Sequence, residues 1–266
     1  MNYKKTLWID KKEIENIPTS EYWNNKDIEL KKIWSIPDDD YNALEKKFLS
    51  KGLFQQFKSL TFKLKLNNKV GASLAAGNCI LESFIVNHNN EIKKLYCLEM
   101  SEHRIHEYAP KVLNHYKVNS KSIELCLGSF YELKFKNNSL DFILLSQAFH
   151  HADNPIALLN EIKRVIKDDG HILILGEHFF NLKTRFVKAL KHIIKFIINY
   201  KSFRKDNLLI PSWKTLFPGS ITQGDIHYST KEYFDLFNSN GFKIKRRIFR
   251  KYGNQGFILQ MKEFKH

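Results

Sequence analysis

The chain has few of the residues that build disulfide scaffolds, metal modules or membrane spans. It contains 3 cysteines in 266 residues, and Cys79, Cys97 and Cys126 lack metal-ligand spacing, which argues against zinc modules and disulfide frameworks. No stretch reaches the roughly 18 to 20 apolar residues that a transmembrane helix requires. The short apolar run after Lys5 is too brief for a signal-peptide core. We therefore expect a cytoplasmic protein without a metal site.

Acidic residues are scarce relative to basic ones. The chain has 43 Lys plus Arg against 28 Asp plus Glu, a net charge of +15. Of the basic residues 36 are Lys and 7 are Arg, and Asn numbers 23, a usage that AT-rich coding produces without selection for binding. Arginine favours forked phosphate contacts and base stacking. The charge therefore favours a solvated basic surface or a small anionic substrate over nucleic acid.

Residues 69–177 alternate short apolar runs with helical periodicity. Strands are expected at 70–75, 95–99, 123–127, 140–146 and 171–176, and helices at 80–88, 102–116 and 155–166. Strands separated by helices of about 10 to 15 residues predict right-handed βαβ units and a parallel sheet. A helix at 231–240, then strands at 242–249 and 256–261 around a short turn, predict a C-terminal hairpin.

The two flanks of this region differ from it in composition. Residues 1–66 mix helical periodicity with charge, and the run that ends at Asp40 marks a helix start, so we expect a helical N-terminal cap. Residues 182–198 are basic and amphipathic. Between 179 and 217, nine Lys and Arg stand against Asp206 alone. This segment fits a lid over a substrate pocket, at 179–222, or a helix that contacts an anionic membrane surface.

Several ordered segments carry a family resemblance. They are LKFKNNSLDFILLS at 133–146, AFHHADNP at 148–155, EIKRVIKDDG at 161–170 and YSTKEYFDLFNSNGFKI at 228–244. In this order they resemble class I S-adenosylmethionine-dependent methyltransferases over roughly 70–262. The resemblance implies a Rossmann-like α/β domain at 67–266: a mostly parallel seven-stranded sheet with an antiparallel C-terminal hairpin, carrying the helical cap and the lid. It also implies S-adenosylmethionine as the cofactor.

The turn VGASLAAGNC at 70–79 occupies the place of this family's glycine-rich cofactor loop. In that register Ser73 stands at the usual acidic position, Ala75 and Cys79 at the outer glycines, and Gly77 at the middle one. A glycine in such a turn supplies positive φ or room for the ligand. The form with serine in place of the acid is similar to a subset of the family. We expect the loop to admit the cofactor; the alternative is a fold that has lost cofactor binding.

The remaining cofactor contacts are expected at other strand ends. Glu99 ends the second strand 22 residues after Gly77, followed by Met100, and an acid there can accept both ribose hydroxyls. The alternative is that Glu99 only starts the next helix. The resemblance places Ser129 and Phe130 at the adenine and Ser146 at the end of the fourth strand.

Three histidines are candidate general bases. His150 follows the fourth strand, His178 follows the fifth, and His227 precedes the penultimate helix. Imidazole suits proton transfer at neutral pH. Of the neighbouring pair we expect His150 to face the cleft and His151 to pack structurally, while a surface position is equally typical of His178 and His227. An acceptor that is already anionic needs no base.

The acceptor pocket is expected beside Glu177, Tyr228 and Arg185. Cations of the lid segment complement a phosphate or carboxylate. We therefore expect methyl transfer to an oxygen of a small phosphate-bearing, nucleotide-linked or carboxylated metabolite, in surface-polysaccharide or related metabolism. The alternatives are an RNA methyltransferase and a non-catalytic cofactor-fold protein. An Asn-Pro-Pro-aromatic element for base methylation is absent after the fourth strand, and the sequence leaves the oligomeric state open.

Overall fold

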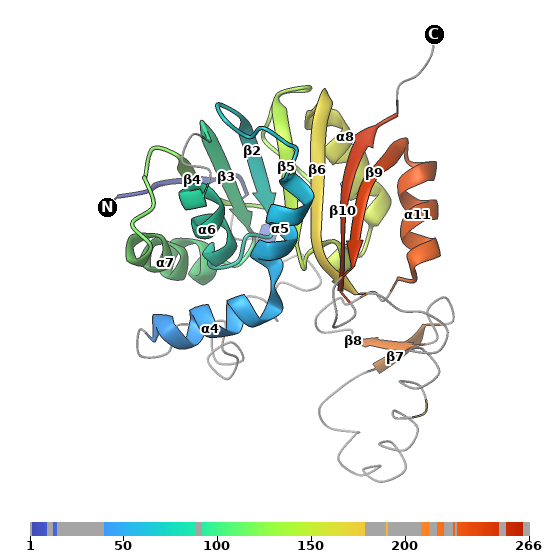
Figure 1. Cartoon of the computed structure of the whole chain (residues 1–266), viewed down its shortest axis with the longest axis horizontal. Coiled ribbons are helices and arrows are strands. Elements are labelled where there is room, and N and C mark those ends of the chain that lie inside the picture. The colour runs from blue at the N-terminus through green and yellow to red at the C-terminus, as the bar shows by residue number, and fades with distance from the viewer. Residues whose placement is uncertain are drawn as a thin grey trace.

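The computed structural model describes residues 2–9, 13, 14, 40–88, 92–178, 190, 209–212, 217–220, 226, 228–249 and 254–262. Within them, eight strands form one mixed sheet in the order β1-β4-β3-β2-β5-β6-β10-β9 (Figure 1). The strands are β1 (Lys4–Leu7), β2 (Val70–Leu74), β3 (Lys94–Glu99), β4 (Ile123–Leu127), β5 (Leu140–Ser146), β6 (Ile166–His178), β9 (Phe242–Phe249) and β10 (Asn254–Met261).

The pairing within the sheet confirms the expected fold class. All pairs from β1 to β6 are parallel. Strand β10 runs antiparallel to both β6 and β9, which makes the C-terminal hairpin. Every position of β4 is buried, as expected for a parallel strand whose two faces are both covered.

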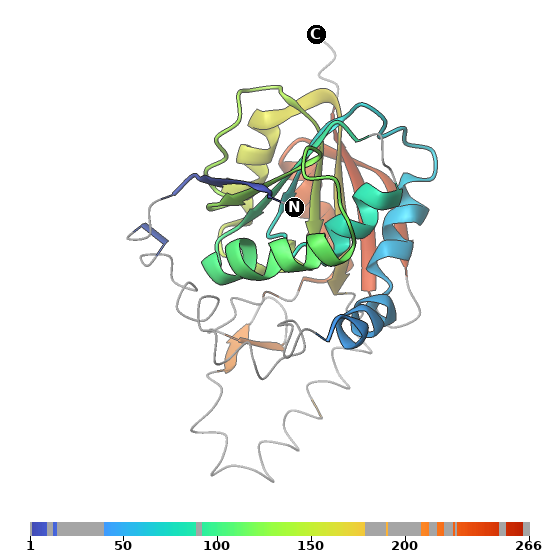
Figure 2. The same ribbon diagram turned by 90° about the vertical axis from the view of Figure 1, so that its left-hand side faces the viewer.

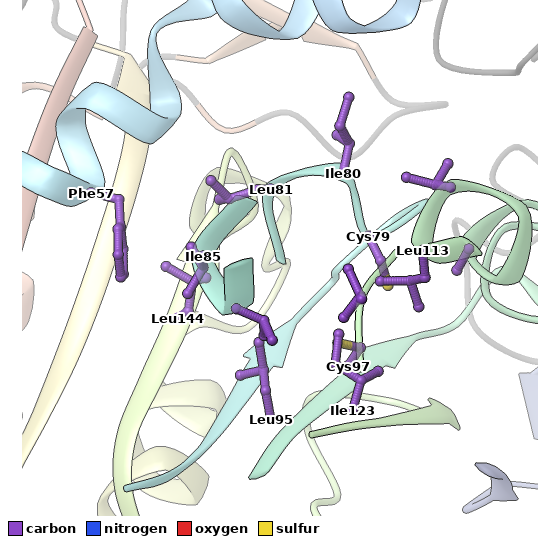
Figure 3. Packing of buried hydrophobic residues seen from close by; sticks show 14 of the residues in the cluster. Phe57, Cys79, Ile80, Leu81, Ile85, Leu95, Cys97, Leu113, Ile123 and Leu144 are labelled. Carbon is purple, nitrogen blue, oxygen red and sulfur yellow. The ribbon is translucent and has the colours of Figure 1, made fainter. Parts of the chain in front are cut away.

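Helices cover both faces of this sheet (Figures 1 and 2). On one face lie α5 (Leu53–Thr61), α6 (Ile80–His88), the π-helical turn Arg104–Tyr108 and α7 (Ala109–His115), and on the other lie α8 (Pro155–Val165) and α11 (Thr230–Ser239). Each face has its own buried cluster. In Figure 3, Ile85 of α6 lies beside Leu144 of β5, between the helix and the sheet.

The helix ends follow capping chemistry that the sequence encodes. Helix α4 (Tyr41–Lys51) begins after Asp40, whose side chain accepts a hydrogen bond from Ala43 N, as the acidic run predicts. It ends at Gly52, which has φ 62°. Helix α11 begins with a capping box between Ser229 and Glu232, which fixes its start.

The sheet has one strand more than the seven expected. Lys4–Leu7 lies parallel to β4, with Lys4 opposite Glu124. Lys4 Nζ lies 2.9 Å from Glu124 Oε1, and Thr6 Oγ1 donates to the same oxygen over 2.7 Å. These contacts neutralise an acid within an otherwise apolar strand, so a short, charged segment pairs as an edge strand. Within the described residues, the predicted N-terminal cap therefore contains a strand, and α4 and α5 also belong to it.

The predicted lid at 179–222 falls largely outside the described residues. Within it the structure describes Leu190, β7 (Leu209–Ser212) and β8 (Phe217–Ser220). Strands β7 and β8 form a separate antiparallel pair, beyond the end of the main sheet where β6 finishes (Figure 1). The basic segment 182–198, with its expected membrane contact, lies outside the described residues apart from Leu190.

Strand β2 depends on a glycine packed against an aromatic ring. Gly71 pairs with Phe142 of β5, and a Cβ added at Gly71 would lie 2.3 Å from Phe142 Cζ. Phe142 is fully buried. The ring therefore fills the volume that any other side chain at position 71 would need.

We expect Gly71→Ala to destabilise the protein by roughly 1–3 kcal/mol, because overpacking a well-filled core forces side chains off their rotamers. The measurement is urea denaturation of Gly71→Ala, Phe142→Leu and the double variant. The smaller leucine relieves the overlap, so the double variant should lose less stability than the sum of the single losses. Additive losses would show that the ring does not limit position 71.

Candidate functional site

The parallel strands bring their carboxyl ends to one edge of the sheet. Leu74, at the end of β2, lies opposite Leu98 of β3 on one side and Leu145 of β5 on the other. The loops that follow these strands are therefore neighbours. Ligands of open α/β sheets bind at this edge, and the expected cofactor and acceptor residues that the structure describes lie in or beside these loops.

The cofactor loop keeps a glycine-type backbone although it has one glycine. Ala75, Gly77 and Cys79 have φ values of 57°, 60° and 61°, so the positions assigned to the family's three glycines are all left-handed. A non-glycine residue in this region costs about 1–2 kcal/mol. The surrounding structure therefore holds a strained loop in the shape that three glycines would adopt freely.

Gly77 leaves space where a ligand would approach the backbone. A Cβ added at this position would meet no atom within 4 Å. The amide of Gly77 instead donates to Glu99 Oε2 over 2.8 Å. The loop crest is thus open in front of the main chain, and the residues present fit a nucleoside-type cofactor at this point.

The carboxylate of Glu99 is held by main-chain amides. Besides the bond from Gly77, its Oε1 accepts hydrogen bonds from Met100 N at 2.9 Å and Ser101 N at 3.0 Å. A carboxylate offers about four acceptor positions, so one remains for a ribose hydroxyl. The sequence predicts that Glu99 accepts hydrogen bonds from both ribose hydroxyls. This would require the hydrogen bond from Gly77 N to Glu99 Oε2 to break. The same bonds show that Glu99 also orders the turn after β3.

Ser73 points away from the loop crest and contacts a second acid. It is buried, and its Oγ donates to Glu82 Oε1 of α6 over 2.5 Å. Burial raises the pKa of Glu82 to about 7; the hydrogen bond from Ser73 acts against that rise, and the charge of Glu99 adds to it. A carboxyl therefore stands beside the strand end even though the expected acid at position 73 is a serine. The sequence analysis did not select Glu82, whose only signal is its place in SLAAGNCILE.

The other expected cofactor residues lie on neighbouring loops. Ser129 Oγ accepts a hydrogen bond from Tyr131 N at 3.2 Å. The half-buried ring of Phe130 packs edge-on against Tyr131 at 4.7 Å. Tyr131 also donates to Asp153, which joins the loop after β4 to the loop after β5. Met100 and Ser146 are half-buried.

A second buried cluster forms around Glu177 at the end of β6. Its carboxylate accepts hydrogen bonds from Tyr233 Oη at 2.7 Å and Phe149 N at 3.2 Å, and His150 Nδ1 lies 2.9 Å from Oε2. Burial would raise the pKa of Glu177, but the charge of His150 and the hydrogen bonds from His150 and Tyr233 lower it below its ordinary value. Glu177 is therefore an ionised, fully buried acceptor.

The two adjacent histidines differ in burial. His150 is 4% exposed, whereas His151 is half-buried. Residues 149–151 form one turn of 3-10 helix, and this turn directs His150 inward to Glu177. His178 lies next to it, with ring centroids 4.8 Å apart. The structure thus brings together three of the predicted site residues, His150, His178 and Glu177.

Tyr228 borders this cluster, and two expected residues are outside the described part. The ring of Tyr228 lies 5.1 Å from that of Tyr233, and burial, followed by the charge of Glu177, raises its pKa. His227 and Arg185 lie outside the described residues. Tyr233 was not expected in the site; its one signal is its place in the first turns of an amphipathic helix.

Comparisons with known proteins support this assignment of the fold. Residues 74–174 match the family model described as a methyltransferase domain. Among curated proteins, an uncharacterized methyltransferase of Schizosaccharomyces pombe is 39% identical over 56 residues, which cover 21% of this chain and 19% of that protein. The chain thus spans about a fifth of the length of this relative.

Solved methyltransferases share the architecture. A methyltransferase from Aquifex aeolicus, described as dependent on S-adenosylmethionine, superposes with a TM-score of 0.54 at 17% identity, covering 78% of this chain and 89% of that chain. The mitomycin 7-O-methyltransferase MmcR superposes with a TM-score of 0.57 at 13% identity, covering 94% of this chain and 66% of that chain. Together with the family match, they confirm the expected fold and indicate S-adenosylmethionine as the cofactor.

The part of the chain that the structure describes contains neither a metal-ligand cluster nor a membrane-spanning helix. It holds no group of three His, Cys, Asp or Glu side chains arranged for a metal ion. None of its helices combines the length and apolar character needed to cross a bilayer.

We expect Glu99→Gln to weaken binding of S-adenosylhomocysteine roughly 10- to 100-fold, since a charged acceptor contributes about 1.5–3 kcal/mol per hydrogen bond. The glutamine amide would also oppose the Gly77 N–H. Titration calorimetry gives the dissociation constant. Asp235→Asn, which removes an exposed carboxylate of α11, is the matched control and should bind as the parent does. Unchanged affinity in Glu99→Gln would remove Glu99 from the cofactor site.

We expect Tyr233→Phe to destabilise the protein by about 1.5–3 kcal/mol at pH 7, because a buried ionised acceptor loses one donor. The pKa of Glu177 is lowered on folding, so its contribution is present at neutral pH and is lost as the pH falls through the acid range. The variant therefore loses less stability than the parent between pH 7 and pH 4. Urea denaturation at both pH values measures this, and equal losses would contradict it. Tyr228→Phe is the control, since Tyr228 does not donate to Glu177.

Proposed function

We propose that this chain, which carries a class I S-adenosylmethionine-dependent methyltransferase domain, transfers a methyl group to an oxygen of a small anionic metabolite. The family match supports methyl transfer in its general form. The choice of oxygen and of an anionic acceptor is the further step, and it rests on the cluster at the ends of β5 and β6 and on the charge of the chain.

The observation that carries the proposal is the contact between His150 Nδ1 and Glu177 Oε2 at 2.9 Å. A neutral imidazole that donates from Nδ1 to a carboxylate has its basic lone pair on Nε2. Glu177 thereby fixes the tautomer and orientation of His150 and stabilises the imidazolium once a proton has been taken up. His150 is proposed to accept the proton of the acceptor hydroxyl, while Glu177 and Tyr233 hold the ring in place.

The donor side of the site works by positioning. When bound, S-adenosylmethionine supplies an electrophilic methyl carbon on a sulfonium. Glu99 and the backbone of the loop at Gly77 are the residues that would hold it, and His150 stands on the loop after β5, the strand adjacent to β2. Displacement at carbon requires an in-line approach, and much of the rate can come from such positioning.

The anionic acceptor is inferred from charge. The net charge is +15, and the segment between β6 and α11 contributes a concentration of lysines with few acids. Cations bordering a pocket favour phosphate or carboxylate groups. Methylation in surface-polysaccharide biosynthesis, on a phosphate-bearing or nucleotide-linked sugar, is the context that we propose for such an acceptor. The solved relative MmcR is described as an O-methyltransferase, which agrees with oxygen as the target.

We expect His150→Gln to lower the methyl-transfer rate roughly 10²- to 10⁴-fold, the usual contribution of a positioned general base, while S-adenosylhomocysteine still binds. The assay follows labelled methyl transfer from S-adenosylmethionine to a panel of hydroxylated sugar phosphates, nucleotide-linked sugars and hydroxy acids. An RNA oligonucleotide is included in the panel and tested over a range of salt concentrations.

His151→Gln is the matched control and should retain the parent rate within a few-fold, because His151 is more exposed than His150. Full activity in His150→Gln would exclude it as the base. Methylation of RNA alone would overturn the small-molecule assignment. Absence of binding to both S-adenosylmethionine and S-adenosylhomocysteine would identify a non-catalytic member of the fold.

A further inference from the structure

The first turn of α6 holds a buried acid that the proposed reaction does not use. Glu82 is 1% exposed. Its Oε1 accepts the hydrogen bond from Ser73, whereas Oε2 has no hydrogen-bond partner among the described residues. An unpartnered carboxylate oxygen away from water is costly.

Glu82 is connected to both ends of the cofactor loop, through its hydrogen bond with Ser73 and through its place in the first turn of α6. Ser73 lies two residues before Ala75, where the loop begins, and α6 starts directly after Cys79, where the loop ends. The amide of Ser83 donates to Cys79 O at 3.0 Å. The carboxyl of Glu82 therefore lies behind the loop, between the end of β2 and the start of α6.

The groups that face Glu82 do not neutralise it. It interacts electrostatically with the thiols of Cys79 in the loop and Cys97 in β3, and with the carboxylate of Glu99 at the end of β3. Figure 3 shows Cys79 and Cys97 close together at the end of the loop. Both thiols are buried, and burial raises the pKa of each. Among the described residues, the charged side chain that shifts the pKa of Glu82 is that of Glu99, which is also an acid.

In this environment Glu82 is partly protonated near neutral pH. Burial is the main cause that raises the pKa to about 7, and the charge of Glu99 acts in the same direction. A positive charge brought close to the loop acts in the opposite direction, because it favours the ionised carboxylate. Glu82 can therefore lose its proton when a cationic ligand binds at the loop.

The cofactor changes charge during the proposed reaction. S-adenosylmethionine carries a sulfonium, an ammonium and a carboxylate, with net charge plus one, whereas the demethylated product has a neutral thioether and net charge zero. We propose that Glu82 is a specificity-determining residue of the cofactor site, which favours the sulfonium donor over the demethylated product by giving up its proton when the cation binds.

The proton balance follows from this coupling. Glu82 releases its proton to solvent when the donor binds, and it takes a proton back from solvent once the sulfonium charge is gone. By linkage, the affinity for the donor rises as the pH increases through neutrality, while the affinity for the product changes little. The inference rests on the proposed function, because it requires S-adenosylmethionine at this loop.

The test is titration calorimetry of the full chain with S-adenosylmethionine, S-adenosylhomocysteine and sinefungin, which carries an amine in place of the sulfonium. Measurements at pH 7 in two buffers with different ionisation enthalpies give the number of protons released. We expect a substantial fraction of one proton for the two cationic ligands and close to none for S-adenosylhomocysteine. Between pH 6 and pH 8, the preference for S-adenosylmethionine over S-adenosylhomocysteine should increase severalfold.

Two variants separate Glu82 from other acids. Glu82→Gln retains an oxygen for the bond from Ser73 but does not titrate, so proton release and the pH dependence of the preference should disappear while all three ligands still bind. Glu124→Gln is the matched control, since Glu124 is a buried acid of β4 paired with Lys4, and it should release protons as the parent does.

A ligand-free measurement checks the folded state. The pKa of Glu82 is raised on folding, so its contribution to stability is full below the ordinary glutamate pKa and is lost as the pH rises through about 7. The melting temperature of the parent should therefore fall more between pH 5 and pH 8 than that of Glu82→Gln.

The outcomes distinguish this inference from the proposed function. If S-adenosylmethionine and S-adenosylhomocysteine bind the parent with the same proton release, Glu82 does not sense the sulfonium, and methyl transfer stands. Proton release that persists in Glu82→Gln would likewise show that Glu82 does not sense the sulfonium, and the proposal of methyl transfer would stand. If none of the three ligands binds the parent, the proposed function fails first. Because the three ligands are compared on the parent protein, this part of the test does not depend on whether any variant folds.

Discussion

The hydrogen bond from Gly77 N to Glu99 is the contact on which the candidate cofactor site depends. It joins the loop after β2 to the end of β3, and the amides of Met100 and Ser101 hold the same carboxylate from the other side. The left-handed residues of the loop are strained, so their shape has to be imposed by such contacts. A loop with one glycine thus obtains from its neighbours the left-handed geometry that glycine adopts without strain.

Two buried glutamates in this molecule show how partners decide the state of the same side chain. Glu177 and Glu82 are both inaccessible to water, yet the pKa of Glu177 is lowered and that of Glu82 is raised. The difference lies in their neighbours, because Glu177 has hydrogen-bond partners in His150, Tyr233 and Phe149 N, whereas Glu82 has the hydroxyl of Ser73, its own backbone amide and the like charge of Glu99. Burial alone therefore does not fix the protonation of a buried acid.

The strands and helices of the main domain were predictable because their apolar periodicity is local, and the family resemblance supplied their order. Contacts across the fold were not predictable in this way. Ser73 meets Glu82 only after a loop reverses the chain, and Tyr233 reaches Glu177 across 56 positions. Which of two adjacent histidines turns inward depends on a single 3-10 turn, for which periodicity gives no signal. The edge strand Lys4–Leu7 is short and charged, so its sequence does not read as a strand.

The long segment between β6 and α11 is anchored at both of its ends. Glu177 stands at one end, and at the other Tyr233 donates to it while Ile226 N bonds to His150 O at 2.8 Å. The core thus fixes the points where this segment leaves and returns, and the entropy of closing such a loop grows only with the logarithm of its length. Residues between these two points can therefore be inserted, deleted or replaced at little cost in stability, and under the proposed function the choice of acceptor can change while the residues that carry the reaction stay the same.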